Sequence, residues 1–235
     1  MAEKWFYAQS IPEPGEVVVL DAEETRHATR SRHLEIGSEA TLFDGRGRTA
    51  RVRLAEVSRR SATALVLETQ QHPVPKPRLH LACALPKGDR VSTLLSMATQ
   101  LGMTDFTPLT AHRSVVRPAT ETPERWLRIV REAGKQSRRP WQPVFHPPRA
   151  PEEAVEGAAP ETRVWLMDAE GEKPEAERAQ QAADLLLLVG PEGGFTSEET
   201  RQMKAAGARA LTLSSGILRI ETAAVAALAR LGRED

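Results

Sequence analysis

Short runs of alternating apolar and polar residues fill the first third of the chain. Alternation with period two occurs in three consecutive runs, at 40–43, 49–57 and 63–67. An Asp-Gly-Arg-Gly turn at 44–47 separates the first two runs, and a polar stretch at 58–61 separates the last two. Such a pattern is typical of antiparallel strands that bury one face. We therefore expect residues 1–72 to form a small β-barrel.

The pattern changes after a stiff segment at 73–78, which contains three prolines and is expected to be a linker. Beyond it, strands and helices are expected to alternate through a second domain at 79–235. The expected strands are 79–85, 105–109, 163–167, 184–190 and 210–213. The expected helices are 90–101, one that begins at Thr122 and Pro123, one from Thr196 to Gly207, and 221–231. Alternation of this kind predicts a parallel α/β sheet.

The composition indicates the cellular compartment and excludes some kinds of site. The chain has one cysteine, Cys83, so it can form neither an internal disulfide nor a thiolate metal site, and we expect no metal. Residues 1–10 contain no apolar stretch of the length that an export signal needs, so we expect a cytoplasmic protein. The longest apolar run, Leu185 to Val189, is far below the roughly 20 residues that span a membrane.

Charge is unevenly distributed although the net charge is zero. Residues 24–60 carry nine arginines against five acidic residues, and residues 110–150 carry nine basic against three acidic residues. Residues 151–207 reverse this balance, with five basic against thirteen acidic residues. One basic face could therefore attract phosphates while the whole molecule stays neutral. The alternative is that these are solvated helix and strand surfaces without a function.

Two segments carry candidate chemistry. Gly-Pro-Glu-Gly-Gly-Phe at 190–195 lies between an apolar strand and a helix with capping-box spacing, where α/β sheets bind ligands. It lacks the third glycine of a dinucleotide fingerprint and the Lys-Ser/Thr of a phosphate loop. The second segment, 213–223, follows the last expected strand and brings Arg219 and Glu221 to the same edge of the sheet.

Several short motifs, in order, resemble those of the RsmE-like family of bacterial ribosomal RNA uridine-N3 methyltransferases in the SPOUT superfamily. The matching pieces are Arg26-His27, Arg32, Asp44-Gly45, Leu85-Pro86-Lys87-Gly88, Ala98-Thr99-Gln100-Leu101-Gly102, Arg113-Ser114-Val115, Glu132-Ala133, Gln136-Ser137, Arg139, the glycine loop 190–195, Ile217-Leu218-Arg219 and Glu221-Thr222-Ala223. Each piece alone is short, but their order and spacing extend over nearly the whole chain.

The resemblance implies a PUA-like N-terminal barrel that binds RNA and a C-terminal α/β domain with a trefoil knot. It also implies a homodimer that methylates uracil N3 in 16S ribosomal RNA, with the assembled small subunit as the preferred substrate. S-adenosyl-L-methionine would be the cofactor, bound by Met167, Asp168, Gly190, Pro191, Glu192, Gly193, Gly194, Leu213, Ile217, Leu218 and Arg219.

Arg219 and Glu221 are the expected catalytic residues. Arginine stays charged and can stabilise an oxyanion but cannot act as a base, so proton removal would fall to Glu221 or to water. The residues expected to bind RNA are Arg26, Arg30, Arg32, Arg46, Arg48, Arg113, Arg117 and Arg139.

The chain departs from the family pattern at five positions. The family usually has Gly at Ser214, Arg at Gly216, Thr at Ile220, Glu at Gln100 and Glu at Lys135. Three of these positions lie in the segment before the last helix. Two alternatives therefore stay open: a related methyltransferase that acts on another RNA base, and an RNA-binding or ribosome-assembly protein of the same fold without catalysis.

Overall fold

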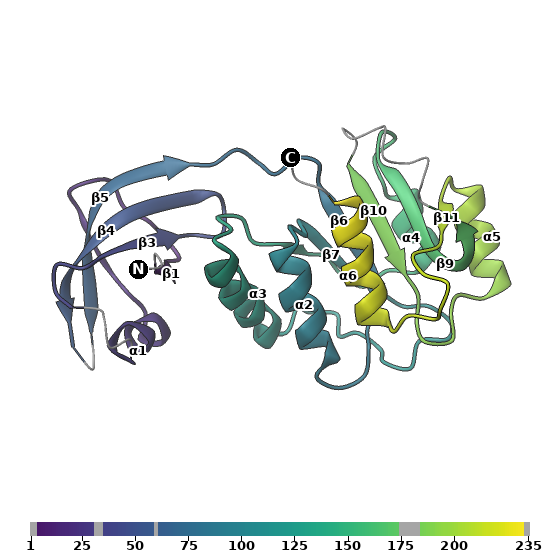
Figure 1. The fold of residues 1–235 in the computed structure, drawn as a ribbon, viewed down its shortest axis with the longest axis horizontal. Coiled ribbons are helices and arrows are strands. Elements are labelled where there is room, and N and C mark those ends of the chain that lie inside the picture. The colour runs from purple at the N-terminus through teal and green to yellow at the C-terminus, as the bar shows by residue number, and fades with distance from the viewer. Residues whose placement is uncertain (1–3, 31–34, 59–60, 174–183, 233–235) are drawn as a thin grey trace. The chain divides into compact units, whose positions relative to one another are not determined.

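The structure is a computed structural model that describes residues 4–30, 35–58, 61–173 and 184–232, and the side chains of residues 29 and 30 are not included (Figure 1). It consists of two compact units. The first unit is Met1–Val74 together with Arg131–Gln142, and the second is Pro75–Val130 together with Pro143–Asp235. No helix in these ranges is both long and apolar enough to cross a membrane.

The first unit is built on a five-stranded sheet in the order β1-β3-β4-β5-β2. The strands are β1 (Trp5–Tyr7), β2 (Val17–Val19), β3 (Glu39–Phe43), β4 (Arg48–Val57) and β5 (Ala62–Gln71). Alternate residues of β4 are buried, among them Val52 and Leu54, and they pack with Phe6 and Leu42 in one core. Helix α1 (Ala22–Arg30) contributes the fully buried Ala28 to this core.

The turn between β3 and β4 receives the separate segment 131–142. Asp44 Oδ1 accepts hydrogen bonds from the backbone N–H groups of Arg46 and Arg48 at 2.7 and 3.0 Å, which closes the turn. Gly47 has φ +89°, and a Cβ there would lie 2.4 Å from the ring of Trp141. Trp141 Nε1 in turn donates to the carbonyl of Pro73 at 2.8 Å. Gly47 is therefore required both by its backbone conformation and by the close approach of the indole.

A buried ion pair also attaches this segment. Lys135, near the end of helix α3 (Glu124–Ser137), donates to Glu24 Oε1 of α1 at 2.7 Å, and both side chains are buried. Lys135 also contacts Glu132. Although burial opposes the charge, these two carboxylates raise the pKa of Lys135. Lys135 is thus the cation that balances Glu24.

The second unit is a six-stranded parallel sheet in the order β11-β9-β10-β6-β7-β8. The strands are β6 (Leu79–Ala84), β7 (Asp105–Leu109), β8 (Val144–Phe145), β9 (Arg163–Glu172), β10 (Leu185–Val189) and β11 (Arg209–Leu211). Strand β10 comes late in the chain, yet it pairs between β6 and β9. The chain order of the strands therefore changes direction beside β10, which is where parallel sheets bind ligands, at the carboxyl ends of the strands.

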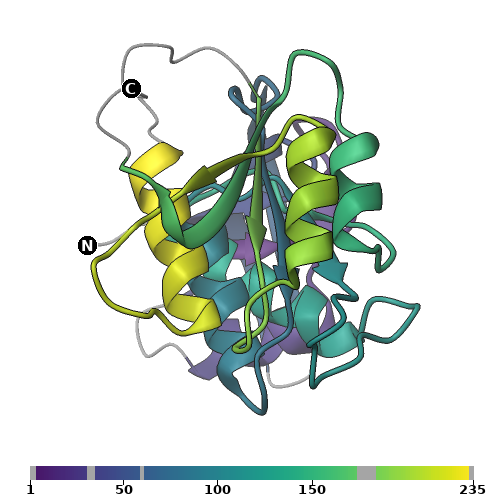
Figure 2. The same ribbon diagram turned by 90° about the vertical axis from the view of Figure 1, so that its right-hand side faces the viewer.

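Helices cover both faces of this sheet (Figure 2). Helices α2 (Arg90–Gln100) and α6 (Ile220–Leu231) lie together on one face, over buried residues such as Leu81, Leu187 and Phe106. Helices α4 (Pro151–Glu156) and α5 (Ser197–Ala205) lie on the other face, over Leu186 and Leu188. Because successive residues of β10 face opposite sides, a strand covered on both faces must be apolar throughout.

A polar network closes the amino ends of β6 and β7. Asp105 accepts from Arg78 Nη2 at 2.6 Å and lies 2.8 Å from His146 Nε2. Although burial opposes it, hydrogen bonds from His146, Arg78 and Thr104 hold the pKa of Asp105 well below its usual range. His80 Nε2 lies 2.8 Å from Thr107 Oγ1, and burial lowers the pKa of His80 to about 4.

The predicted fold class is confirmed, and the expected strands and helices agree with the structure within a few residues. The three strands expected to be antiparallel pair in that way, as β3, β4 and β5. Strand β1, which pairs parallel with β3, was not predicted, nor were β2 and β8. Helices α1 and α4 were not predicted, nor was the place of 131–142 in the first unit. The trefoil knot and the domain bounds 1–72, 73–78 and 79–235 stay predictions.

Replacing Lys135 with Met should lower the free energy of unfolding by about 3 kcal/mol, because Glu24 would remain buried without its cation. Urea denaturation measures this change. In the double variant Glu24→Met, Lys135→Met, much of the loss should be recovered, since no uncompensated charge remains. If the single and double variants were equally destabilised, lost packing rather than the charge would be responsible.

Acid should destabilise the protein through His80. The unfolded histidine takes up a proton near its ordinary pKa of 6.5, whereas the folded one resists protonation down to about 4. Its contribution is therefore complete above pH 6.5 and is lost as pH falls toward 4, by at most about 3 kcal/mol. Urea unfolding at pH 7 and pH 4.5 should show a smaller pH dependence for His80→Gln than for wild type. Equal dependence in both proteins would contradict the assignment to His80.

Candidate functional site

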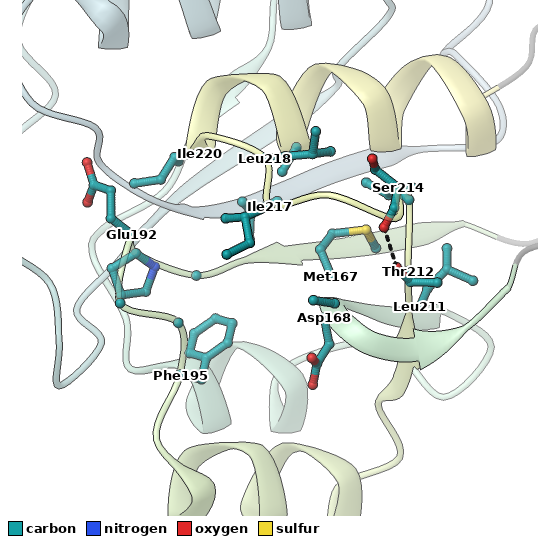
Figure 3. A pocket seen from close by; sticks show the side chains of 18 of the residues that line it. Met167, Asp168, Glu192, Phe195, Leu211, Thr212, Ser214, Ile217, Leu218 and Ile220 are labelled. Carbon is teal, nitrogen blue, oxygen red and sulfur yellow. Dashed lines mark hydrogen bonds between the residues drawn. The ribbon is translucent and has the colours of Figure 1, made fainter.

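A cavity of about 340 Å³ lies at the carboxyl ends of β9, β10 and β11 (Figure 3). Three segments line it: 167–169 of β9, 189–195 from the last residue of β10 onward, and 211–220, except 215 and 219, from the end of β11 to the start of α6. Thr200 and Ala223 complete the lining. Its volume is in the range of small-molecule sites. The sheet thus brings together segments that are about 50 residues apart in the chain.

The glycine loop after β10 has the conformation that its sequence favours. Gly194 has φ +69° and donates to the carbonyl of Pro191 at 2.8 Å, which closes a tight turn. A Cβ on Gly190 would lie 2.9 Å from the ring of Phe195, so the ring packs directly on the glycine backbone. The loop ends at Thr196, whose hydroxyl accepts from the backbone N–H of Glu199 and starts helix α5. Glycine therefore permits close packing at one position and a left-handed backbone at another.

The hydroxyl of Ser214 closes a turn in the segment before α6. Ser214 Oγ accepts from the backbone N–H of Gly216 at 3.1 Å, and Thr212 Oγ1 donates to the Ser214 carbonyl at 3.1 Å (Figure 3). Two of the positions that depart from the family pattern, 214 and 216, thus bond to one another. Ile217 in the same segment is 94% exposed although it lines the cavity.

The cavity wall is partly apolar and partly acidic. Met167, Leu213 and Leu218 supply apolar surface, while Asp168 and Glu192 supply carboxylates. Asp168 Oδ1 accepts from the backbone N–H of Glu170 at 3.0 Å, which fixes the carboxylate at the end of the segment from β9. Such a wall suits a ligand with a flat apolar part and hydrogen-bonding or cationic groups.

Ten of the eleven residues expected to bind the cofactor line this cavity: Met167, Asp168, Gly190, Pro191, Glu192, Gly193, Gly194, Leu213, Ile217 and Leu218. Arg219 is not among the lining residues. It is the N-cap of α6, with an exposed side chain, and lies between two lining residues, Leu218 and Ile220.

Glu221 faces a different group. Its Oε1 lies 3.8 Å from Arg90 Nη1, and Arg90 Nη2 lies 3.7 Å from Glu192 Oε1. Glu221 Oε2 is buried and has no hydrogen-bond partner among the described residues. Burial, together with the carboxylate of Glu221, raises the pKa of the Cys83 thiol. Cys83 is therefore a neutral core residue.

The arginines expected to bind RNA have varied surroundings. In the first unit, Arg46 is exposed, Arg26 Nε donates to the Ala22 carbonyl, and Arg48 pairs with Glu13 at 2.8 Å. Arg139 is half-buried, the side chain of Arg30 is not described, and Arg32 lies outside the described residues.

In the second unit, Arg113 and Arg117 are both exposed, and Arg113 donates to the carbonyl of Gly193 at 2.8 Å. Arg113 therefore contacts the glycine loop, which its sequence context did not indicate.

Ten further lining residues were not among those expected to bind the cofactor: Ala169, Val189, Phe195, Thr200, Leu211, Thr212, Ser214, Gly216, Ile220 and Ala223. Phe195, Ser214, Gly216, Ile220 and Ala223 lie within the two segments that were predicted to carry the chemistry, 190–195 and 213–223. Thr200 comes from helix α5, where the sequence gave no such signal. Among the residues that the structure describes, no three His, Cys, Asp or Glu side chains are placed to hold a metal ion.

Comparison with known proteins gives consistent matches. Residues 73–232 match the RNA methyltransferase domain family, and residues 20–67 match the RNA methyltransferase PUA domain. The chain is 34% identical to ribosomal RNA small subunit methyltransferase E of Mycobacterium bovis, over 99% of this chain and 92% of that protein.

Two solved structures are similar over almost their full length. The ribosomal RNA small subunit methyltransferase E from Neisseria gonorrhoeae, bound to S-adenosyl methionine, has a TM-score of 0.87 and 31% identity, covering 97% of this chain and 96% of that one. A methyltransferase from Legionella pneumophila, in complex with the bound cofactor SAM, has a TM-score of 0.87 and 28% identity, covering 98% and 97%.

Proposed function

The chain belongs to the family of ribosomal RNA small subunit methyltransferase E, and we propose that it methylates N3 of a uridine in 16S ribosomal RNA with S-adenosyl-L-methionine as methyl donor. The cavity at the carboxyl ends of β9, β10 and β11 is the observation that carries this proposal. Three loops, all predicted as ligand-binding from sequence or resemblance, converge on it.

The residues present fit the cofactor. The cavity of about 340 Å³ is large enough for a ligand of this size, and its apolar side chains can contact an adenine ring. At Gly194 no atom lies within 4 Å of the place that a Cβ would take, so a ligand can approach the backbone closely and hydrogen-bond main-chain groups. The carboxylates of Asp168 and Glu192 suit a ligand that carries ammonium and sulfonium charges.

S-adenosyl-L-methionine supplies an electrophilic methyl group when it is bound. The neutral imide of uracil is a poor nucleophile, so N3 must lose its proton, and negative charge then spreads onto O2 and O4. The protein must align N3 with the methyl group, which contributes roughly 7 to 11 kcal/mol in ideal cases, and must stabilise this charge.

Arg219 is the residue proposed to stabilise the charge on the uracil. It lies between two cavity-lining residues, and its side chain is exposed, so it can reach a base that is bound beside the cavity. A guanidinium stays protonated and offers several fixed donors to an oxyanion. Because Arg219 does not line the cavity itself, its loss should affect the reaction more than the affinity for the cofactor.

Glu221 is proposed as the acceptor of the N3 proton, with water as the alternative. Within the part of the chain that the structure describes, its buried Oε2 has no hydrogen-bond partner and retains the capacity to accept one. Its other oxygen lies 3.8 Å from Arg90 Nη1.

We propose that the predicted basic residues other than Arg113, among them the exposed Arg26, Arg46 and Arg117, contact RNA phosphates. The match of residues 20–67 to the PUA domain of RNA methyltransferases supports binding by the first unit. The assembled small subunit in the cytoplasm is the proposed form of the substrate. The domain bounds 1–72, 73–78 and 79–235 and the trefoil knot belong to the same proposal.

A homodimer is also proposed. Ile217 lines the cavity but is 94% exposed, and Met97 on the neighbouring helix α2 is 42% exposed. Large apolar side chains exposed beside a ligand site favour a covering partner. A second copy of the chain could complete the cavity wall at Ile217.

Methyl transfer tests the function directly. The chain should transfer label from S-adenosyl-L-methionine to small ribosomal subunits that lack the modification, and nucleoside mass spectrometry should identify 3-methyluridine. Naked 16S RNA, tested in parallel, should be the poorer substrate. A different methylated base would favour the related-methyltransferase alternative, and RNA binding without methyl transfer would favour the noncatalytic one.

Arg219→Ala should lower the single-turnover rate at least about tenfold, because a charge-assisted hydrogen bond to the developing oxyanion is lost. The dissociation constant for the cofactor should change little. Arg230→Ala, on the exposed end of the same helix, is the matched control and should keep the wild-type rate. An unchanged rate in Arg219→Ala would remove Arg219 from the mechanism.

A further inference from the structure

We infer that Arg113 is a positioning residue of the cofactor pocket: it holds the glycine loop in its binding conformation and does not act chiefly as an RNA contact. The inference rests on the proposed function, because it concerns the same pocket. Arg113 lies in the segment after β7, and its partners lie some 80 residues further along the chain.

Arg113 contacts the loop both through hydrogen bonds and through van der Waals packing. Arg113 Nη1 donates to the Gly193 carbonyl at 2.8 Å, with the Phe195 carbonyl at 3.5 Å from the same nitrogen. The aliphatic stem packs on Gly193, where a Cβ would lie 3.4 Å from Arg113 Cδ. The guanidinium therefore bonds to the turn that lines the cavity, and the stem covers its outer side.

A second link ties the same segment to the end of the loop. Glu199 Oε1 accepts from the backbone N–H of His112 at 2.7 Å, and its Oε2 accepts from the backbone N–H of Thr196 at 2.7 Å. Although burial opposes it, these backbone hydrogen bonds lower the pKa of Glu199, so the carboxylate stays charged. The neighbouring residues 112 and 113 thus attach to both the middle and the end of the loop.

Cofactor binding should depend on this attachment. The loop contains glycines at 190, 193 and 194, which allow many backbone conformations when nothing restrains them. Ordering a flexible loop reduces affinity, whereas a loop held in place before binding does not incur that loss. Arg113 supplies a charge-assisted hydrogen bond to a carbonyl of that loop, which is stronger than a bond between neutral groups.

Arg117 provides a matched control in the same segment. Its side chain is exposed and forms no hydrogen bond or ion pair within the described part of the chain. Both arginines were predicted to bind RNA, but only Arg113 contacts the glycine loop. A phosphate contact and a loop contact predict different results for the two residues.

The test uses the full chain as wild type, Arg113→Met, Arg113→Lys and Arg117→Met. Calorimetry with S-adenosyl-L-methionine, without RNA, should give about tenfold weaker binding for Arg113→Met. Arg113→Lys keeps a donor and should recover most of the affinity, and Arg117→Met should match wild type. In turnover assays, Arg113→Met should raise KM for the cofactor and largely keep kcat at saturation.

Salt titrations of RNA binding test the alternative, in which the arginine contacts an RNA phosphate. Loss of a phosphate contact reduces the slope of log affinity against log salt by about one. The slope should fall in Arg117→Met and stay near wild type in Arg113→Met. Melting without ligand checks that each variant folds, and Arg113→Gln replaces Arg113→Met if that variant does not.

Unchanged cofactor affinity in Arg113→Met, with a reduced salt slope, would overturn the inference and return Arg113 to the RNA surface. If wild type itself failed to bind S-adenosyl-L-methionine, the proposed function would fall, and the inference with it. The two failures are therefore distinguished by the wild-type titration.

Discussion

Strand β10 constrains the whole second unit, because it pairs with β6 on one side and β9 on the other while helices cover both of its faces. All five of its residues, Leu185 to Val189, are buried. A strand in that position cannot contain a polar side chain without an unpaired buried group. The chain must therefore turn polar and flexible immediately after Val189, and this is where the glycine loop begins.

The two ends of the sheet differ in how their polar groups are satisfied. At the amino ends, Arg78, Asp105 and His146 bond to one another and form a closed network. At the carboxyl ends, backbone groups of the glycine loop and the segment before α6 surround a cavity. A site that binds ligands needs groups that are positioned but not fully used. The network therefore stabilises the amino edge, whereas at the carboxyl edge backbone groups remain positioned to bind a ligand.

Sequence patterns predicted elements with strong periodicity or capping signals and missed those without them. Helix α1 contains only two apolar residues among nine, so its apolar periodicity is weak. Its remaining signal was Asp21, which accepts from the backbone N–H groups of Glu23 and Glu24 at the helix start. The attachment of 131–142 to the first unit depends on Trp141 and Lys135, whose partners are 68 and 111 residues away. No local pattern records such pairs.

The residues that line the cavity were predicted well where backbone conformation determines the lining and less well where side chains do. Glycines and a capping box identified the loop at 190–196 because they report local conformation. The role of Arg113 could not be predicted from the local sequence. A guanidinium in a basic segment suggests phosphate binding unless its hydrogen-bond acceptor is known. The acceptor is a carbonyl brought close by the pairing of β7 and β10 on either side of β6.

The same distinction between backbone shape and side-chain charge applies to Ser214 and Gly216 in the segment before α6. Ser214 keeps the turn closed through its own hydroxyl, so the shape of the segment does not depend on a glycine there. The absence of an arginine at Gly216 changes charge rather than shape. Arg219 then remains as the cationic side chain of segment 212–219, at the N-cap of α6. In the proposed mechanism, stabilisation of a developing negative charge beside this loop therefore falls on Arg219.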